Sequence, residues 1–205
     1  MKAGLSIMGY PDKLEVIIVQ QVNLLRDGKP VKMSKRKGEF YDMERLIEEV
    51  GLDAVRFFFL LRSADAPLNF DLSLAKKLSS ENPVYYVQYL YARVHNLLLH
   101  GEDKGILPDE EGIRFLNLPE ERSLMLRLLY FPDLVENMAL KREVHHLTHY
   151  LLDLANIFHS YYQKYRIVDT ENKVLSSGRL YLVKALKQVV ANCFDIIKIR
   201  KLERM

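Results

Sequence analysis

The chain has 205 residues, of which 49% are hydrophobic and 28% are charged, a balance typical of a globular protein with one good core. The net charge of +3 excludes a polycation, so any nucleic-acid role must rest on a local basic surface. A single cysteine, Cys193, excludes an intramolecular disulfide and a zinc site built from several cysteines. No apolar run is long enough for a bilayer and the N-terminus is too weakly apolar for a signal peptide, so we expect a cytoplasmic protein.

The first part of the sequence predicts the end of a helix followed by two strands. Met1–Met8 stops at Gly9, a typical helix C-cap, and a chain that starts on a helix end is expected to be part of a longer protein. Leu14–Leu25 is rich in Val, Ile and Leu and predicts a strand covered on both faces. Asp27-Gly28 predicts a turn into a second strand near Pro30–Met33. Because two strands alone are marginal in water, we expect the hairpin to belong to a larger sheet that these residues do not contain.

From Asp42 onward the apolar residues recur at the helical period. Asp42 is expected to cap a helix that ends at Val50, Asp53 to cap the next helix, and Ala66–Phe70 to form a loop. Further helices are expected at Asp71–Leu78, Asn82–Gly101, Pro119 to just before Pro132, Pro132–Ala139, Glu143–Arg166 and Gly178–Ile197. The sequence therefore predicts a mainly α fold, an antiparallel helical bundle preceded by a small α/β hairpin, with parts at residues 1–52 and 53–205.

A cationic stretch, Lys32-Met33-Ser34-Lys35-Arg36-Lys37-Gly38, lies between the predicted hairpin and the helix that Asp42 opens. A basic run of this kind is usually a solvated turn or a localisation signal. Its position between a strand, a tight turn and a capped helix favours instead a loop that holds phosphate. The run resembles the Lys-Met-Ser-Lys-Ser signature loop of class I aminoacyl-tRNA synthetases, with Arg36 in place of the last Ser.

Further motifs narrow the resemblance to one family. Asp53-Ala54-Val55-Arg56 is similar to the Asp-Ala-Leu-Arg motif that names the DALR anticodon-binding domain, with Val55 in place of Leu. The run from Glu81 to Tyr89, followed by Ala92-Arg93, is similar to the first bundle helix of arginyl-tRNA synthetases, and Glu203-Arg204-Met205 resembles that family's C-terminus. Over essentially its whole length, the chain resembles the C-terminal part of a bacterial-type arginyl-tRNA synthetase.

The resemblance implies an arginine–tRNA ligase that uses ATP with Mg to form arginyl-adenylate and then passes arginine to arginine tRNA. It implies that the loop closes over ATP through Lys32, Met33, Ser34, Lys35 and Arg36, and that Lys35 is catalytic. An ammonium beside the leaving pyrophosphate stabilises the charge that builds there in the transition state. We expect a monomer without membrane association, with residues 1–52 as the end of the catalytic domain and 53–205 as the DALR domain.

One part of the family pattern is missing. No His-Ile-Gly-His signature, which binds adenine and phosphates in this family, occurs in the 205 residues. We therefore expect these residues alone not to form arginyl-adenylate, and to retain only RNA binding.

Aromatic residues supply the candidate RNA contacts. Tyrosines at helical spacing are more often half-buried packing residues with a hydrated hydroxyl, and that is our expectation for most of them. Unpaired anticodon bases, however, are bound on aromatic faces and arginine planes. The resemblance to arginyl-tRNA synthetases implies that Tyr89, Tyr162, Arg166 and Met205 contact the anticodon.

Two alternatives remain open from the sequence. His145 and His149 are one helical turn apart, as metal ligands often are, but neither a general-base Glu nor a third ligand accompanies them. We therefore expect surface or capping histidines and no metal site. For the whole chain, the alternative to the ligase is a free-standing, non-catalytic helical module that binds RNA or a protein partner, with the basic run as a solvated turn.

Overall fold

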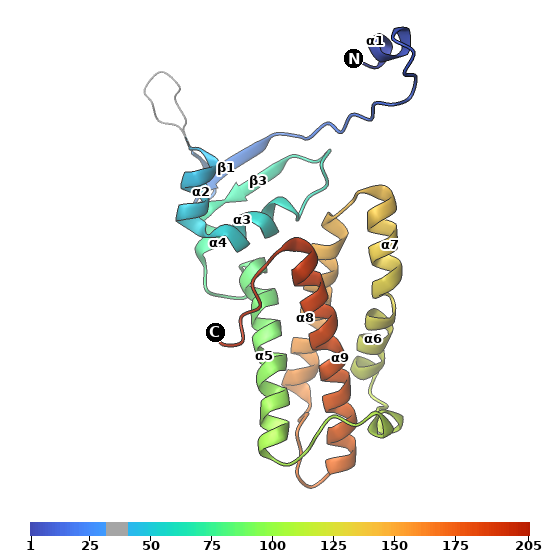
Figure 1. Cartoon of the computed structure of the whole chain (residues 1–205). Helices are drawn as coiled ribbons and strands as arrows, with labels where there is room; N and C mark the ends of the chain where they lie inside the picture. Colours follow the sequence, from blue (N-terminus) through green and yellow to red (C-terminus); the bar gives the residue numbers. More distant parts are fainter. Residues whose placement is uncertain (32–40) are drawn as a thin grey trace.

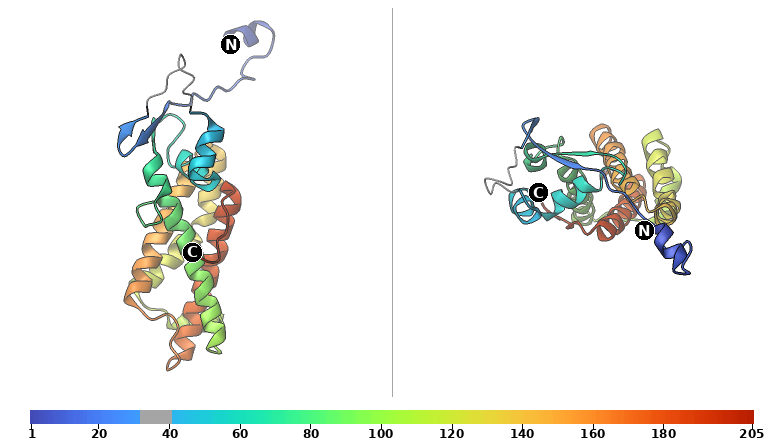
Figure 2. Two further views of the ribbon diagram at one scale, coloured as in Figure 1. Left: turned by 90° about the vertical axis from the view of Figure 1, so that its left-hand side faces the viewer. Right: turned by 90° about the horizontal axis from the view of Figure 1, so that it is seen from above.

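The computed structural model describes residues 1–31 and 41–205. An elongated bundle of helices carries a small α/β layer at one end (Figure 1). The first helix, α1 (Lys2–Ile7), lies apart from both, beyond an extended segment, and the view from above places it to one side of the bundle helices (Figure 2). Among the described residues, no helix has the length and apolar character needed to cross a membrane.

The α/β layer is built on a three-stranded sheet with β1 (Val22–Arg26) in the centre. β2 (Lys29–Pro30) pairs antiparallel with β1 across the Asp27-Gly28 turn, where both residues have positive φ. β3 (Leu68–Asp71) pairs parallel with β1 on the other side, so this chain itself supplies a third strand, contrary to the expectation that it holds only the hairpin. Three short helices pack beside the sheet: α2 (Met43–Val50), α3 (Leu52–Phe59) and α4 (Leu72–Lys76).

The bundle has three long helices at its centre, α5 (Pro83–Asp103), α8 (His145–Lys164) and α9 (Lys173–Ile197), which pack against one another. α6 (Pro119–Leu129) and α7 (Phe131–Lys141) cover α8, and the short 3-10 helix η2 (Glu110–Phe115) packs on α9. The fully buried side chains that join the three central helices include Leu90, Leu151, Leu154, Phe158, Leu186 and Phe194. The predicted fold class is confirmed: a mainly helical chain with a small sheet.

Several predicted helix starts are confirmed by their caps. The side chain of Asp42 accepts a hydrogen bond from the backbone N–H of Arg45 at the start of α2. Asp71 caps α4 in the same way, and Asn82 caps α5 with Pro83 at its first position. These local signals need no tertiary partner, which is why they can be read from the sequence.

The predicted long first strand is wrong for most of its length. β1 starts at Val22, and residues 14–21 form an extended segment without regular pairing. Gln20 donates its backbone N–H to the carbonyl of Ala64, but the side chains from Val16 to Val19 remain exposed. The second strand is β2, at Lys29–Pro30, and the predicted Lys32 and Met33 lie outside the described residues.

A predicted loop contains a strand. Leu68–Asp71 forms β3, in the stretch expected to be irregular, because parallel pairing with β1 places Asn69 opposite Asn23 and Phe70 opposite Leu24. The Phe70 side chain is fully buried and its ring centroid lies 5.0 Å from that of Phe58. Four residues are too few to show a strand pattern without knowledge of that partner.

Two helix starts also differ from the prediction. α3 starts at Leu52 with Gly51 as its cap, so Asp53 lies inside the first turn and its carboxylate is free for another role. α9 starts at Lys173, capped by Asn172, whereas the predicted start was Gly178. Gly178 lies inside the helix, and it is a glycine that packs on Gly112. A Cβ at Gly178 would lie 2.2 Å from the Gly112 carbonyl oxygen.

Candidate functional site

A hollow of about 420 Å³ lies between α5, α8 and the C-terminal end of the chain. Its walls are formed by Tyr89, Ala92, Arg93, Asn96, Leu97, His100, Tyr162 and Met205. Three of the four residues predicted as anticodon contacts, Tyr89, Tyr162 and Met205, therefore lie at one place although they are far apart in the sequence. The helical spacing places Tyr89, Arg93 and Asn96 on one face of α5, three or four residues apart.

Arg93 is held between two tyrosine rings. Its guanidinium carbon lies 4.4 Å from the centroid of the Tyr89 ring and 4.5 Å from that of the Tyr162 ring, within the range of a cation–π interaction. Nη2 of Arg93 also donates a hydrogen bond to the Tyr89 hydroxyl. Arg93 belongs to a stretch similar to the family's first bundle helix, but it was not predicted as a site residue. Its position four residues after Tyr89 on one helix was the available signal.

His159 contacts the guanidinium of Arg93 from the protein interior. Its side chain is 6% exposed, and Nδ1 lies 3.3 Å from Nη1 of Arg93. Since a guanidinium only donates, Nδ1 must accept, and the neutral ring then carries its proton on Nε2. Burial, and next the charge of Arg93, lower the pKa of His159 to about 4. The ring is therefore uncharged at neutral pH and packs against Tyr86 and Tyr89, with centroids 4.8 and 5.6 Å away.

A row of ring faces extends from the hollow along α5. The rings of Tyr85 and Tyr89 are nearly parallel, with an interplanar angle of 11° and centroids 6.2 Å apart. On α8, Tyr162 is partly exposed and its ring lies 6.1 Å from that of the buried Phe158. The site thus offers accessible aromatic surface next to a positively charged group that can donate hydrogen bonds. This combination suits a flat, polar ring better than an aliphatic ligand.

Arg166 is not part of this hollow. It lies two residues beyond the end of α8, is exposed, and is absent from the residues that line the hollow. Its carbonyl oxygen accepts a hydrogen bond from Nη1 of Arg179, at 2.8 Å. Nε of Arg179 in turn donates to the buried carboxylate of Glu121 at 2.8 Å, so this corner is held by an interior ion pair. The structure brings three predicted contacts together and leaves Arg166 at a separate place.

The histidine-rich start of α8 has ordinary partners. Nε2 of His149 lies 3.1 Å from the carbonyl oxygen of Leu61, and Nε2 of His146 lies 3.1 Å from Glu143. Burial, and next the charges of His146 and His149, lower the pKa of His145. In the described parts of the chain, no group of three or more His, Cys, Asp or Glu side chains is arranged to hold a metal ion. Cys193 is fully buried, and burial raises the pKa of its thiol.

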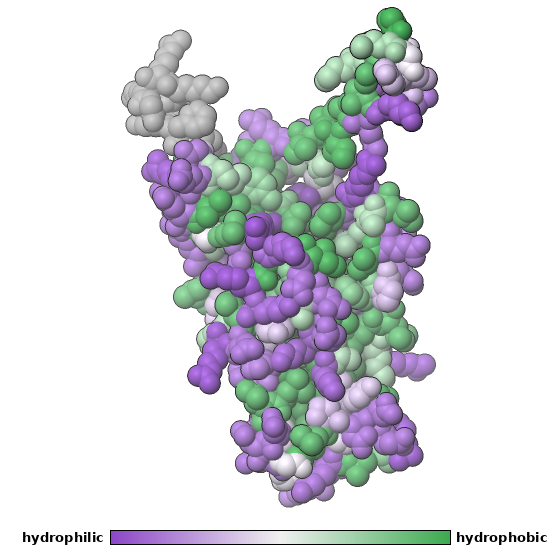
Figure 3. Space-filling model, in the orientation of Figure 1, coloured by the Kyte–Doolittle hydropathy of each residue, from purple (hydrophilic) through white to green (hydrophobic). Residues whose placement is uncertain are grey.

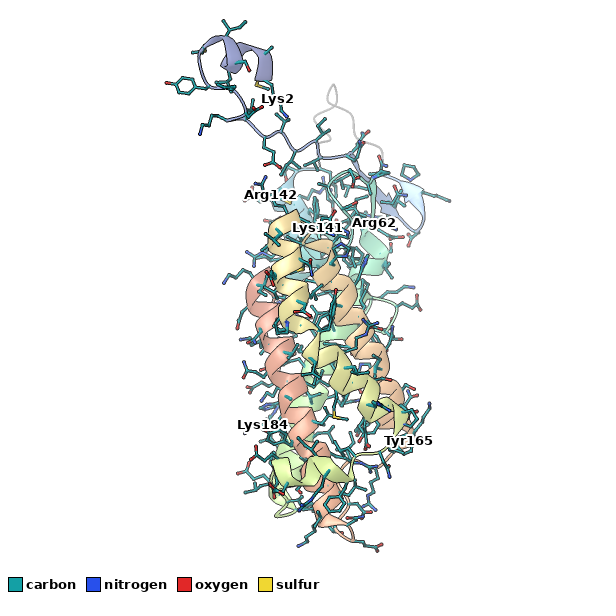
Figure 4. All side chains as sticks on the ribbon, turned by 90° about the vertical axis from the view of Figure 1, so that its right-hand side faces the viewer. Lys2, Arg62, Lys141, Arg142, Tyr165 and Lys184 are labelled. Carbon is teal, nitrogen blue, oxygen red and sulfur yellow. The ribbon has the colours of Figure 1, made fainter. Side chains whose placement is uncertain are left out.

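A larger hollow, of about 620 Å³, lies between residues 15–19 and the turn that joins α7 to α8. Arg62, Lys141 and Arg142 lie close together at this end of the bundle (Figure 4). Carboxylates accompany these cations, and Arg142 forms an ion pair with Glu15. Because the exposed segment 15–19 forms one wall, this space is a gap between two parts of the molecule. No tyrosine is among the described residues that line it, so its cations lack the flanking ring faces of the Arg93 site.

The predicted ATP-binding loop, Lys32, Met33, Ser34, Lys35 and Arg36, lies outside the described residues.

The part of the sequence that contains the hollow matches a known protein family. The profile of the DALR anticodon binding domain matches residues 87–205, which include every residue that lines the hollow. The chain belongs to the DALR anticodon-binding domain family. Asp53 and Arg56, in the motif quoted for this resemblance, precede the matched region.

Relatives of this DALR protein extend the similarity to the whole chain. It is 44% identical over 208 residues to an arginine–tRNA ligase of Bacillus pumilus and 46% identical over 211 residues to one of Desulfosudis oleivorans. Both comparisons cover 100% of this chain, and they cover 37% and 38% of the relatives. The chain thus spans little more than a third of the length of these proteins. The predicted resemblance to arginyl-tRNA synthetases is confirmed.

Solved structures show the same architecture. A Campylobacter jejuni protein assigned as an arginyl-tRNA synthetase superposes with a TM-score of 0.85 at 28% identity, over 100% of this chain and 44% of that one. The Thermus thermophilus arginyl-tRNA synthetase gives a TM-score of 0.73 at 26% identity, over 100% of this chain and 38% of that one. The DALR bundle and the α/β layer before it therefore occur together in these proteins.

Proposed function

We propose that this chain is the tRNA-binding part of an arginine–tRNA ligase and that the Arg93 hollow binds an unpaired anticodon base of arginine tRNA. The observation that carries the proposal is the guanidinium of Arg93, held between the rings of Tyr89 and Tyr162 beside the chain's last residue, Met205. A base placed on a tyrosine face gains roughly 1–3 kcal/mol from stacking. Its polar edge can then accept hydrogen bonds from Arg93.

The charge distribution around the hollow suits RNA. Hydrophilic residues gather over the C-terminal tail and the adjoining part of α9 (Figure 3). The tail contributes cations at Lys198, Arg200, Lys201 and Arg204. Two of them are partly neutralised, because Lys201 pairs with Asp195 at 2.7 Å and Arg200 with Asp53 at 2.8 Å. We therefore propose a modest phosphate contribution, with the aromatic hollow as the source of selectivity.

The chemistry of the parent enzyme is proposed from its relatives and from the signature loop. Arginine would react with ATP, bound with Mg, and the activated arginine would pass to the terminal ribose of the tRNA. Lys35, within the loop Lys32–Arg36, would stabilise charge on the departing pyrophosphate. We further propose the division into a catalytic part at 1–52 and an anticodon-binding part at 53–205, in a monomeric cytoplasmic enzyme.

The binding proposal is tested by titrating the 205-residue chain with two transcripts, arginine tRNA and the same tRNA with an exchanged anticodon. We expect the cognate transcript to bind about tenfold or more tightly, a difference of roughly 1.4 kcal/mol. Affinity for both should fall as salt rises, because phosphate contacts release counterions. Equal affinity for the two transcripts would contradict anticodon recognition and would leave a general RNA-binding module.

A further inference from the structure

The chain's last residues form a tail that leaves α9 sharply and returns alongside α5 (Figure 1). Lys198 ends α9 with a left-handed backbone, at φ 58°, and Ile199 is then buried. The tail follows α5 toward the middle of this helix: Arg200 contacts Gln88, Glu203 lies 3.6 Å from His95, and Met205 lines the hollow. The position of one wall of the hollow thus depends on how this tail is held.

Asp53 holds the tail from the side of α3. Its carboxylate is buried and accepts hydrogen bonds from Nε of Arg200 at 2.8 Å and from Nε2 of Gln88 at 3.0 Å. The backbone N–H of Arg200 also points at this carboxylate, at 3.4 Å. A buried carboxylate requires such donors, and here they come from two elements that are distant in sequence. Asp53 therefore joins the tail, α3 and α5 at one point.

Arg56 holds the tail one helical turn further along α3. Its Nη1 donates a hydrogen bond to the carbonyl oxygen of Lys198 at 2.6 Å. This carbonyl belongs to the residue that ends α9, where a cation is favoured by the helix dipole and by the unpaired carbonyls. Asp53 and Arg56 thus contact consecutive parts of the same turn, Lys198 and Arg200.

The anchor is close enough to control Met205. Met205 lies five positions after Arg200, and a fully extended chain of five residue steps reaches roughly 17 Å. Without the anchor, only the exposed contacts of Lys201 with Asp195 and of Glu203 with His95 would hold the last residues. The tail would then sample more of that range, and placing Met205 beside Tyr162 would cost conformational entropy on each binding event. With the anchor, that ordering is already present before RNA arrives.

We propose that Asp53 and Arg56 are positioning residues for the RNA site: they fix the C-terminal tail so that Met205 completes the Arg93 hollow. This inference rests on the proposed base-binding function. It assigns a physical task to the two charged residues of the Asp-Ala-Val-Arg motif, neither of which lines the hollow itself.

The first experiment follows the tail without RNA. A nitroxide label is attached through Arg204→Cys; the native Cys193 is buried and leaves the new thiol as the reactive one. We expect slow, restricted label motion in the otherwise unchanged chain and fast nanosecond motion after Asp53→Ala or Arg56→Met. Asp153→Ala is the matched control, because it removes an ion pair with Arg127 between α6 and α8 without touching the tail. Unchanged label motion in folded Asp53→Ala and Arg56→Met chains would overturn the proposal.

The second experiment measures binding of the cognate and anticodon-exchanged tRNAs. Each tail-releasing variant should weaken cognate binding by about tenfold, with little change for the exchanged transcript. In a chain shortened to end at Arg200, the same substitutions should have no further effect, because the segment they position is gone. An equal loss in the shortened chain would overturn the proposal, since these residues would then act through stability alone.

The two experiments separate this inference from the proposed function. If the unchanged chain fails to discriminate the transcripts, anticodon recognition fails whatever the label shows. If it discriminates and Arg56→Met binds with unchanged selectivity, only the positioning role fails. Circular dichroism checks that each variant is folded. If Asp53→Ala does not fold, Arg56→Met still tests the proposal, because it retains the aliphatic stem of Arg56.

Discussion

The bundle and the segment before the sheet use the same apolar residue types to opposite effect. In the bundle, Leu154 and Phe158 are completely buried between helices of this chain. In the extended segment, Ile18 and Val19 remain 72% and 70% exposed although their neighbourhood is the most strand-like in the sequence. The difference teaches that a hydrophobic pattern predicts burial only where a partner surface exists. In the bundle, the apolar face of each helix packs on other helices of the same chain. The Arg93 hollow therefore lies on helices that these 205 residues can hold in place.

The largest expected effect on stability comes from a pair of alanine substitutions, one in the bundle and one in the extended segment. Leu154→Ala should lower the free energy of unfolding by about 2–5 kcal/mol, because it opens a cavity in a packed core. Ile18→Ala should change it by about 0.5 kcal/mol or less, because the side chain is already in water. Urea unfolding followed by circular dichroism measures both. Similar losses for the two variants would show that the segment at residue 18 is packed in solution.

Charged groups allow the same comparison between buried and exposed side chains, starting with a buried ion pair. The carboxylate of Glu121 is fully buried and accepts hydrogen bonds from Nε of Arg179 and from the Tyr161 hydroxyl, at 2.8 and 2.9 Å. Glu121→Gln should cost about 2 kcal/mol, since it leaves the guanidinium without its counter-charge.

The matched control for Glu121 is an exposed ion pair elsewhere on the bundle. Glu111→Gln removes the partner of Arg114, and both of these side chains are mostly in water. Its cost should stay below about 0.5 kcal/mol in the same urea assay, because solvent screens the pair. A cost as large as that of Glu121→Gln would contradict the distinction between interior and surface charge.

The pH dependence of stability tests the interior around Arg93. The pKa of His159 is about 4 in the folded chain, against about 6.5 for a histidine in water. Between these values the unfolded chain binds a proton that the folded chain does not, so stability falls as pH falls from about 6.5 to about 4. With solvent screening allowed for, the contribution of this one group is about 1–2 kcal/mol.

The variant His159→Phe isolates that contribution from the carboxylates, which also titrate at low pH. It should lose stability less steeply than the unchanged chain over the same interval, in urea titrations at pH 4.5, 5.5, 6.5 and 7.5, chosen as about one-unit steps across the window. Parallel curves for the two proteins would contradict a buried, neutral His159.

The sequence predicted those features that depend on neighbours along the chain. Asp42, Asp71 and Asn82 cap their helices as expected, and the tyrosines of α5 and α8 lie where the helical period places them. β3 and the contacts of Asp53 were missed because each depends on residues far away in the sequence, at β1 for the first and at Arg200 for the second. No spacing rule contains that information.

The residues that line the candidate hollow could be named only in part from the sequence, because the hollow also depends on distant residues. Tyr89, Tyr162 and Met205 came from the resemblance, and the fold brings them together. Arg93 was not proposed because an arginine on a helix is usually solvated. Only the structure shows that its guanidinium lies between two tyrosine rings. Arg166 was proposed but lies apart, beyond the end of α8 where helical spacing no longer applies.

The measurement that tests the central claim most directly is the effect of Arg93→Ala on discrimination between arginine tRNA and its anticodon-exchanged form. Arg114→Ala, which removes an exposed arginine from η2, is the control. We predict that the ratio of the two dissociation constants falls by about tenfold in Arg93→Ala and is unchanged in Arg114→Ala. An unchanged ratio in a folded Arg93→Ala chain would contradict the assignment of this hollow as the base-binding site.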